Sequence, residues 1–168
     1  MEKIWIGIDN GISGTIGILG TNIIPEFFKT PVVKVQDYCK AKKNITRLDA
    51  VEFHNRLKSL KGLSEIMNID LKICLERPMV NPSLFKASES ALRCFEAMWA
   101  IIELLNLPVQ FIPSTDWQKE LLPKGTKGEE LKRMSFELGN RWYPQFKEVK
   151  HPDRDGLLIA HWMKLKNL

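Results

Sequence analysis

Several features that define particular classes of protein are missing from this chain of 168 residues. No apolar run approaches the roughly 20 residues of a membrane-spanning helix. The first residues, MEKIWIG, lack the basic stretch and the long apolar core of a secretory signal. We also find no internal repeat, low-complexity tract or linker. The length suits one compact domain with a real core, so we expect a single domain over residues 1–168, in the cytoplasm and away from membranes.

Cysteine is scarce as well. The chain has three cysteines, which are widely spaced and lie among apolar or mixed neighbours: Cys39, Cys74 and Cys94. An odd number at such spacing suggests neither a disulfide framework nor a set of zinc ligands. We therefore expect reduced thiols in an intracellular protein.

Positive charge is in moderate excess. The chain has 25 lysines and arginines against 20 acidic residues, a net charge of +5. This excess is compatible with a nucleic-acid partner but does not demonstrate one. The basic residues gather in Lys40–Arg47, in Lys119–Arg133 and in the C-terminal tail. Each cluster is either part of a nucleic-acid face or a solvated loop.

The first thirty residues predict three antiparallel strands. Isoleucine occupies every second position of KIWIGID, as in a half-buried strand. NGISG then reverses the chain, and TIGIL is predicted as the returning strand of a hairpin. TNIIPEFFK predicts a third strand, in which Pro25 suits only an edge position or a break.

Helices and strands alternate in the rest of the chain. Asp49 is a candidate N-cap for a helix in LDAVEFHNRLKSL, with Glu52 three residues later. IDLKICLE and PVQFIP predict two further strands, the first with leucine and isoleucine along one face. Four more helices are predicted: Ser88–Asn106, a short one from a Ser114 cap to Leu121, Gly128–Asn140, and a last one with Pro152 in its first turn. The order favours an α/β protein with an RNase H-like fold, in which an antiparallel three-stranded meander and two parallel strands form one mixed sheet flanked by helices.

Two acids stand where strands end. Asp9 and Glu76 each close a hydrophobic strand, on the face opposite the main isoleucine or leucine row. If these strands are parallel neighbours, the two carboxylates converge at the edge where ligand sites lie in open α/β sheets. Asp155 opens the last helix, and its side chain can point to the same place. Three such carboxylates repel one another unless cations neutralise them.

Oxygen-only ligands favour Mg²⁺ or Mn²⁺, and two such ions about 4 Å apart support phosphodiester cleavage. Each acid also has a simpler interpretation. Asp9 before Asn-Gly is ordinary turn chemistry, and Asp153 and Asp155 suit the positive end of a helix. The combination of these acids in this order favours the metal site.

Five segments of the chain resemble RuvC-type Holliday junction resolvases, particularly the phage-encoded relatives: IGIDNGISGTIGIL, ICLERP, SALRCFEAMWAIIELLNLPV, IPSTDWQKELL and DGLLIAHW. They span most of the chain in family order. The resemblance implies a homodimeric crossover junction endodeoxyribonuclease of the RNase H-like superfamily. Such an enzyme binds four-way DNA junctions and nicks two strands of like polarity during recombination and repair. It also implies the cytoplasm of a bacterium or of a phage-infected host.

The resemblance carries metal-ligand roles to three acids. Asp9 matches the acid of the first strand, Glu76 that of the fourth strand, and Asp155 the acid that opens the last helix. These residues are expected to hold two Mg²⁺ ions, for which Mn²⁺ substitutes.

The family has one more ligand, Asp or His, usually three or four positions before the last acid. Here Pro152, three positions before Asp155, cannot be a ligand. His151 lies four positions before and Asp153 two. A spacing of four places two residues on one helix face, which favours His151, with Asp153 as the alternative.

The resemblance also points to DNA contacts. Lys119, in WQK, matches a basic position near the scissile phosphate, where it would offset charge on the phosphate. Lys124 and Lys127 flank Gly125 in a loop suited to phosphates, and Lys132 is a weaker candidate. The alternative for Lys119 is an exposed helix lysine.

The segment RPMVNPSLFK occupies the place of a family loop that separates junction strands. Met79 or Phe85 is a candidate for insertion at an unstacked base step, although for Phe85 core packing is the favoured expectation. Arg77 is expected to contact phosphate or to pair with an acid. The predicted helix Ser88–Asn106 has more apolar surface than one core contact needs, so it is either a homodimer interface or a fully buried helix.

Three other functions remain open. DNGISGT resembles the phosphate-binding hairpin of actin-like sugar kinases and ATPases, but those proteins need a second such domain. An RNase H-like nuclease that cuts RNA or other branched DNA is a closer alternative than a kinase or an ATPase. A catalytically inactive junction-binding protein is the alternative that is not an enzyme.

Overall fold

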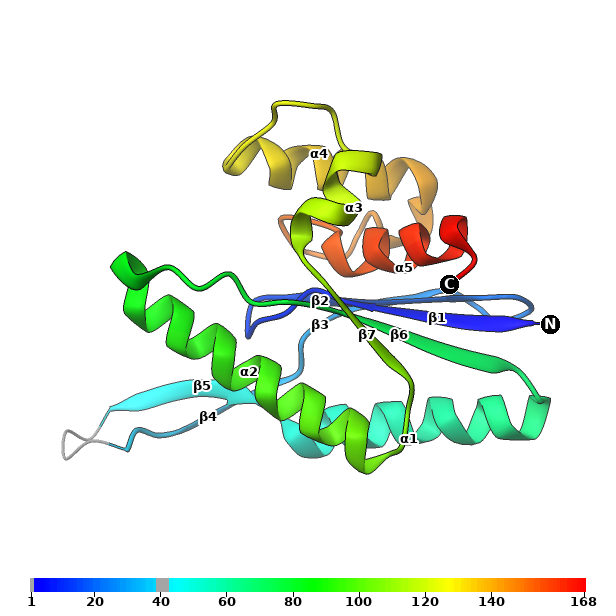
Figure 1. Ribbon diagram of the computed structural model, residues 1–168, viewed down its shortest axis with the longest axis horizontal. Helices are drawn as coiled ribbons and strands as arrows, with labels where there is room; N and C mark the ends of the chain where they lie inside the picture. The colour runs from blue at the N-terminus through cyan, green and yellow to red at the C-terminus, as the bar shows by residue number, and fades with distance from the viewer. Residues whose placement is uncertain (1, 39–42) are drawn as a thin grey trace.

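The structure, a computed structural model, describes residues 2–38 and 43–168. A five-stranded sheet with the order β3-β2-β1-β6-β7 forms the middle layer. Helices α3 (Ser114–Leu121), α4 (Glu129–Trp142) and α5 (Asp155–Lys166) cover one face, and α1 (Ala50–Met67) and α2 (Phe85–Leu104) lie on the other (Figure 1). The strands of this sheet are β1 (Lys3–Ile8), β2 (Thr15–Gly20), β3 (Glu26–Lys29), β6 (Asp70–Glu76) and β7 (Val109–Ile112).

Strand pairing confirms the predicted mixed sheet. Strand β1 pairs antiparallel with β2, and β2 pairs antiparallel with β3. Strand β1 also pairs with β6 in parallel, and β6 with β7. The third strand is shorter than predicted because it begins only after Pro25, whose ring nitrogen has no proton to donate. It lies at the edge of the sheet, the position that Pro25 allows.

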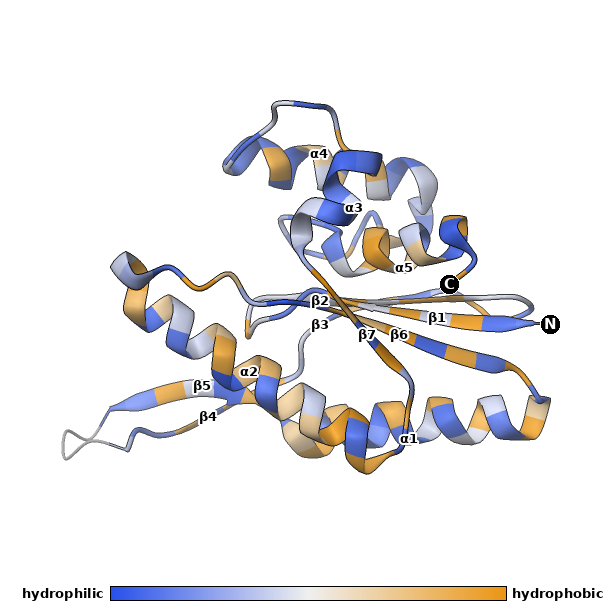
Figure 2. Ribbon diagram, in the orientation of Figure 1, coloured by the Kyte–Doolittle hydropathy of each residue, from blue (hydrophilic) through white to orange (hydrophobic). Residues whose placement is uncertain are grey.

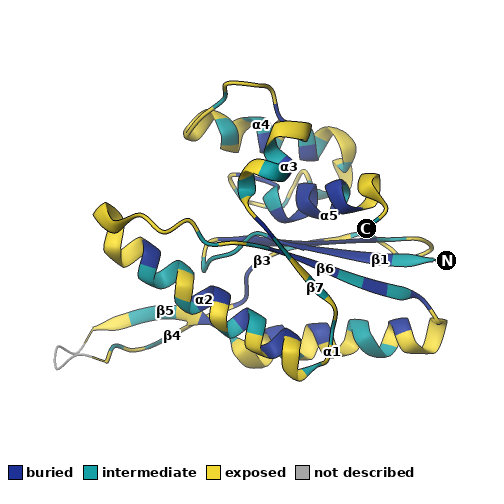
Figure 3. Ribbon diagram, in the orientation of Figure 1, coloured by how far each residue is buried: buried dark blue, intermediate teal, exposed yellow. Residues whose placement is uncertain are grey.

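The alternation of the strands divides the core into two layers. The isoleucines of β1 and the leucine and isoleucine row of β6 pack with α1 and α2. Trp5 and Cys74, on the opposite face, pack with α5. Figure 2 shows the apolar stripes of the strands, and Figure 3 shows that α5 is buried where it faces the sheet. Cys74 and Cys94 are free and buried, and Cys39 lies outside the described residues.

The helices begin close to where they are predicted, with two differences at α2 and α3. Asp49 caps α1 (Ala50–Met67), since its Oδ1 accepts a 3.0 Å hydrogen bond from the Glu52 amide. Helix α2 (Phe85–Leu104) begins earlier than predicted, because the 3₁₀ turn η1 (Pro82–Leu84) leads directly into it. The Ser114 cap is wrong: Ser114 is already helical in α3 (Ser114–Leu121), whose N-cap position is held by Pro113. Helix α4 spans Glu129–Trp142, and the turn η2 (Pro144–Phe146) follows it.

The prediction that Pro152 lies in the first turn of the last helix is wrong. Helix α5 spans Asp155–Lys166, so Pro152 and Asp153 precede it. Asp155 does open the helix, as predicted. None of the helices in the described residues is long and apolar enough to cross a membrane.

The structure contains one element that was not predicted from the sequence. Strands β4 (Val32–Gln36) and β5 (Asn44–Leu48) form a separate two-stranded antiparallel hairpin, which projects away from the main sheet (Figure 1). It contains part of the basic cluster Lys40–Arg47, of which residues 40–42 lie outside the described part of the chain. The side chains of Val32 and Val33 are 44% and 41% exposed, so the hairpin lacks a buried face that the sequence pattern would reveal.

Helix α5 packs unusually close to the sheet, because glycines face one another at the contact. An added Cβ on Gly7 would lie 2.3 Å from the backbone nitrogen of Ala160, and one on Gly156 would lie 2.3 Å from the carbonyl oxygen of Thr15. The Gly156 amide donates a 3.0 Å hydrogen bond to Oγ1 of Thr15. This contact brings the start of α5, with Asp155, to the end of β1.

Candidate metal centre

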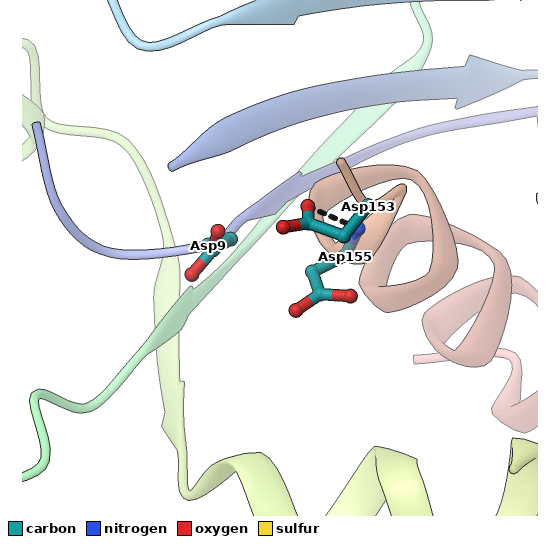
Figure 4. A group of neighbouring side chains, drawn as sticks. All are labelled: Asp9, Asp153 and Asp155. Atoms are coloured by element: carbon teal, nitrogen blue, oxygen red, sulfur yellow. Dashed lines mark hydrogen bonds between the residues drawn. The ribbon is translucent and has the colours of Figure 1, made fainter. Parts of the chain in front are cut away.

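Three aspartates converge at the carboxyl end of the sheet. Asp9 follows the last residue of β1, Asp153 precedes α5, and Asp155 is the first residue of α5. One carboxylate oxygen from each lies within 4.8 Å of the others. Figure 4 shows the three side chains close together where the end of β1 meets the start of α5, with the Asp155 amide 3.4 Å from Oδ1 of Asp153.

Glu76 ends the strand beside Asp9. Ile8 pairs with Leu75 in the parallel ladder, so Asp9 and Glu76 each lie at the carboxyl end of adjacent strands. Oε2 of Glu76 accepts a 2.8 Å hydrogen bond from Nε1 of Trp117, which is fully buried in α3. Glu76 is not one of the three acids of the tight group, but its charge raises the pKa of both Asp9 and Asp155. Trp117 was not among the predicted site residues, although WQK contains it.

Burial and mutual repulsion disfavour ionisation of all these acids at once. The pKa of Asp9 lies well above its usual range, because the carboxyl is buried and because Asp155 and Glu76 repel its charge. Burial and the charge of Asp153 raise the pKa of Asp155 to about 8. Burial, with a smaller effect of Asp153, raises the pKa of Glu76 to about 7. Cations among these oxygens would relieve the repulsion, and a donor set of carboxylate oxygens alone suits Mg²⁺ or Mn²⁺.

The turn after β1 holds the Asp9 backbone in place. The Asp9 amide donates a 3.0 Å hydrogen bond to the carbonyl of Thr15, and the Gly14 amide donates one of 3.0 Å to the carbonyl of Gly11. Gly11 has a φ of 134°, and an added Cβ on Gly14 would lie 2.2 Å from the Asp9 carbonyl oxygen. The glycines of NGISG therefore act as turn residues, and they leave space for the Asp9 backbone.

His151 contacts Asp153 but does not belong to the tight group of aspartates. Because His151 precedes α5, the spacing argument that favoured it as the fourth ligand does not hold. Its Nε2 lies 3.0 Å from the Ser13 carbonyl oxygen, and its Nδ1 lies 3.2 Å from Oδ1 of Asp153. Both ring nitrogens thus have protein partners, whereas Asp153 belongs to the tight group of aspartates.

The aspartates line a pocket of about 460 Å³ whose other lining includes two exposed lysines, Lys29 and Lys132. The charge of Lys132 lowers the pKa of Asp155, so the two groups interact. Lys132 was the weaker of the predicted phosphate contacts, and Lys29 was not predicted at all. Lys29 lies beside the pocket because it ends β3, where it pairs with Thr15 at the start of β2.

The other lysines that were predicted to contact DNA lie around a second pocket. Lys119 and Lys124 line a pocket of about 270 Å³ beside the loop at Gly125. Lys119 is exposed and lies 3.4 Å from Oδ1 of Asp116. Lys127 is exposed in the same loop. None of these three lysines lines the pocket of the aspartates.

The segment after Glu76 is exposed, which corrects the expectation for Phe85. Its side chain is 71% exposed, and that of Met79 is 79% exposed. Phe85 is outside the core because it is the first residue of α2, which extends past the end of the sheet (Figure 3). Arg77 is also exposed, and its amide donates a 2.7 Å hydrogen bond to the carbonyl of Ile112.

Much of the broad apolar surface of α2 belongs to the core. Met98 and Ile102 are fully buried. Phe95 and Trp99 contact Phe111 of β7, with ring centroids 5.5 and 5.0 Å from it. Exposed apolar side chains remain at Leu92 and Leu104.

The fold has counterparts among solved structures. A chain described as T. thermophilus RuvC in complex with Holliday junction substrate is 15% identical, with a TM-score of 0.56, and the alignment covers 98% of this chain and 94% of that one. A second Thermus thermophilus RuvC structure is 17% identical, with a TM-score of 0.53 and coverage of 98% and 96%. Together with the sheet order, this likeness confirms the predicted RuvC-like, RNase H-like fold. No protein-family model and no curated protein sequence matches the chain.

Proposed function

We propose that this protein is a metal-dependent endonuclease that cuts four-way DNA junctions by paired nicks. The observation that carries the proposal is the convergence of Asp9, Asp153 and Asp155, with Glu76 beside them, at one end of the sheet of a RuvC-like fold. The neighbour with the TM-score of 0.56 was solved with a Holliday junction, which supports a branched-DNA substrate.

The four carboxylates fit divalent cations. They supply only oxygen donors. Burial, together with repulsion from neighbouring acids, raises the pKa of Asp9, Glu76 and Asp155, and bound cations would remove that repulsion. In the proposal Asp9, Asp153, Asp155 and Glu76 hold two Mg²⁺ ions, or Mn²⁺ in their place. The bound ions would supply an activated water and stabilise the leaving oxygen. His151 then orients Asp153 instead of binding metal.

The residues around the acids serve to position DNA. Lys29 and Lys132 line the pocket of the aspartates, so they are the candidates for contact with the phosphates next to the cut. Lys119 and Lys124 line the second pocket and Lys127 is exposed in the same loop, where these lysines would add affinity without sequence preference. Met79 and Phe85 are exposed in the segment that follows Glu76, as residues that insert at an unstacked step must be, and Arg77 is exposed to contact phosphate.

Paired nicking requires two sites. We propose that the chain forms one domain and acts as a homodimer, with the exposed apolar residues of α2, Leu92 and Leu104, at the contact. On the sequence resemblance, the proposal places this activity in recombination and repair, in the cytoplasm of a bacterium or of a phage-infected host.

A panel of labelled DNA substrates tests the proposal. Four-way, forked and linear duplex DNA and an RNA–DNA hybrid are incubated with the protein, with and without Mg²⁺. The proposal predicts symmetric nicks in the junction alone, only with metal. Cleavage of the hybrid or the fork at an equal rate would favour a broader RNase H-like nuclease. Tight junction binding without nicks, in Mg²⁺ and in Mn²⁺, would favour an inactive binding protein.

A further inference from the structure

Arg154 lies between two of the acids in sequence and is fully buried, with no exposed surface. A buried guanidinium is costly unless its donors are satisfied. The residue carries no role in the function proposed above. Its contacts show what it does in the fold.

The five N–H donors of Arg154 all have partners within the described residues. Nη1 donates to the carbonyls of His151 and Asp153 over 3.1 and 2.9 Å, and Nη2 donates to those of Phe146 and Val149 over 3.2 and 3.0 Å. Nε donates to Oδ1 of Asn140 in α4 over 3.0 Å. The guanidinium therefore ties residues 146–153 to α4, through neutral acceptors only.

The surroundings are shaped for this side chain. Its guanidinium carbon lies 4.5 Å from the ring centroid of Phe136 and 5.1 Å from that of Phe27. Gly139 of α4 faces the stem, and an added Cβ there would lie 2.4 Å from Cβ of Arg154. The absence of a side chain at residue 139 thus makes room for the arginine.

The backbone of Arg154 is tied to the same acids. Its amide donates a 3.0 Å hydrogen bond to Oγ of Ser135, and that hydroxyl donates to Oδ1 of Asp155. Ser135 is buried in α4. Helix α4 therefore holds the side chain of Asp155 and, through the guanidinium, the backbone of Asp153.

We propose that Arg154 is the positioning residue of the acid centre: by binding four carbonyls of residues 146–153 and Asn140, it sets the places of Asp153 and Asp155 on which metal affinity depends. The inference rests on the proposed function only in that it takes these acids as metal ligands. Lysine cannot replace the arginine, because a single ammonium group with three donors does not match five acceptors in a plane. Groups that orient metal ligands in this way typically change metal affinity about 10- to 100-fold when removed.

The test measures metal binding directly, with Mn²⁺ as the probe, by isothermal titration calorimetry of the full chain. Arg154→Lys is expected to bind Mn²⁺ at least about tenfold more weakly than the wild type. Asn140→Ala removes one acceptor of the guanidinium and keeps the charge of Arg154. Its Mn²⁺ affinity is expected to lie between those of the wild type and Arg154→Lys. In nicking assays the metal concentration for half-maximal rate should rise by the same factor, with a smaller change in the rate at saturating metal.

A matched control separates positioning from stability. Leu57→Ala opens a cavity under α1, on the other face of the sheet, and is expected to lower the melting temperature without changing Mn²⁺ affinity. Wild-type Mn²⁺ affinity in folded Arg154→Lys and Asn140→Ala would overturn the proposal. So would a wild-type protein that binds no Mn²⁺. A wild type that binds Mn²⁺ and nicks no DNA would overturn the proposed function and leave the role of Arg154 intact.

Discussion

The indole N–H of Trp117 donates a 2.8 Å hydrogen bond to Oε2 of Glu76 across 41 residues of sequence. The bond joins α3 to the end of β6, and it lowers the pKa of Glu76 against the effect of burial. The orientation and the charge of this acid thus depend on a tryptophan in the core.

Replacement of Trp117 by phenylalanine should reveal this dependence. Trp117→Phe keeps most of the packing but removes the donor, so the pKa of Glu76 should rise further and metal should bind more weakly. We expect nicking at neutral pH to fall at least about tenfold and to recover partly at higher pH. The measurement is the pH profile of the nicking rate. Trp5→Phe is the control, since the Trp5 indole binds the carbonyl of Leu168, away from the acids; equal losses in both variants would contradict the prediction.

Replacement of Asp153 should reduce nicking and Mn²⁺ affinity much more than replacement of His151, because Asp153 is the proposed fourth metal ligand. Asp153→Asn keeps the size of the side chain but removes a charge from the tight group, so nicking should fall at least about 100-fold and Mn²⁺ affinity should fall with it. His151→Ala should cost less, because the ring contacts Ser13 and Asp153 and lies outside that group. Calorimetry with Mn²⁺ on both variants checks the order. A greater loss in His151→Ala would make the histidine the ligand.

The position of Asp153 depends on where α5 begins, which the sequence does not reveal. Proline is common in the first turn of helices, so Pro152 predicted a helix that included Asp153. In the structure, Arg154 binds the carbonyls of His151 and Asp153, which keeps this segment out of the helix. Those contacts need α4 and Phe27, far away in sequence, so no local pattern predicts them.

Strands with one buried face were predictable, and the exposed hairpin was not. The isoleucines of β1 and the leucine and isoleucine row of β6 alternate because one face packs on α1 and α2. This alternation predicted that Asp9 and Glu76 end two strands, and the structure shows that these strands are parallel neighbours. Strands β4 and β5 bury little, so Val32 and Val33 gave no such signal. Trp117 and Lys29 join the site through tertiary contacts alone.

The close contact between α5 and the sheet should not tolerate a methyl group. Gly156→Ala and Gly17→Ala would place Cβ 2.3 and 2.4 Å from backbone atoms, so each should lose about 1–3 kcal/mol of unfolding free energy or more. Gly62→Ala is the matched control, since nothing lies within 4 Å of its added Cβ in the middle of α1. It should gain about 0.5–1 kcal/mol. Urea unfolding measures all three, and a stable Gly156→Ala would contradict the close packing.

The stability of the metal-free protein should fall as the pH rises from about 5 to about 8. Folding raises the pKa of Glu76 from 4.5 to about 7 and that of Asp155 from 3.8 to about 8. Acids with raised values contribute stability below their unfolded pKa, and that stability is lost as pH rises through the folded pKa. After dialysis against a chelator, the melting temperature should therefore be several degrees lower at the higher pH.

Two controls accompany this pH measurement. Added Mg²⁺ should stabilise the protein more at pH 8 than at pH 5, because it binds the ionised acids of the folded state. Asp9→Asn removes an acid whose own pKa is raised on folding, so it should reduce the difference between the two pH values. Equal melting temperatures of the metal-free wild type at both pH values would contradict the electrostatic account of the site.

The nicking of a labelled four-way junction as a function of Mg²⁺ concentration, by the wild type and by Asp9→Asn, tests the central claim most directly. Asp9 lies in the tight group of aspartates and is held by a rigid turn, so its amide variant should fold normally. The account predicts paired nicks that require metal in the wild type and a rate at least about 100-fold lower in the variant. Nicking without divalent metal, or an unchanged rate in Asp9→Asn, would contradict it.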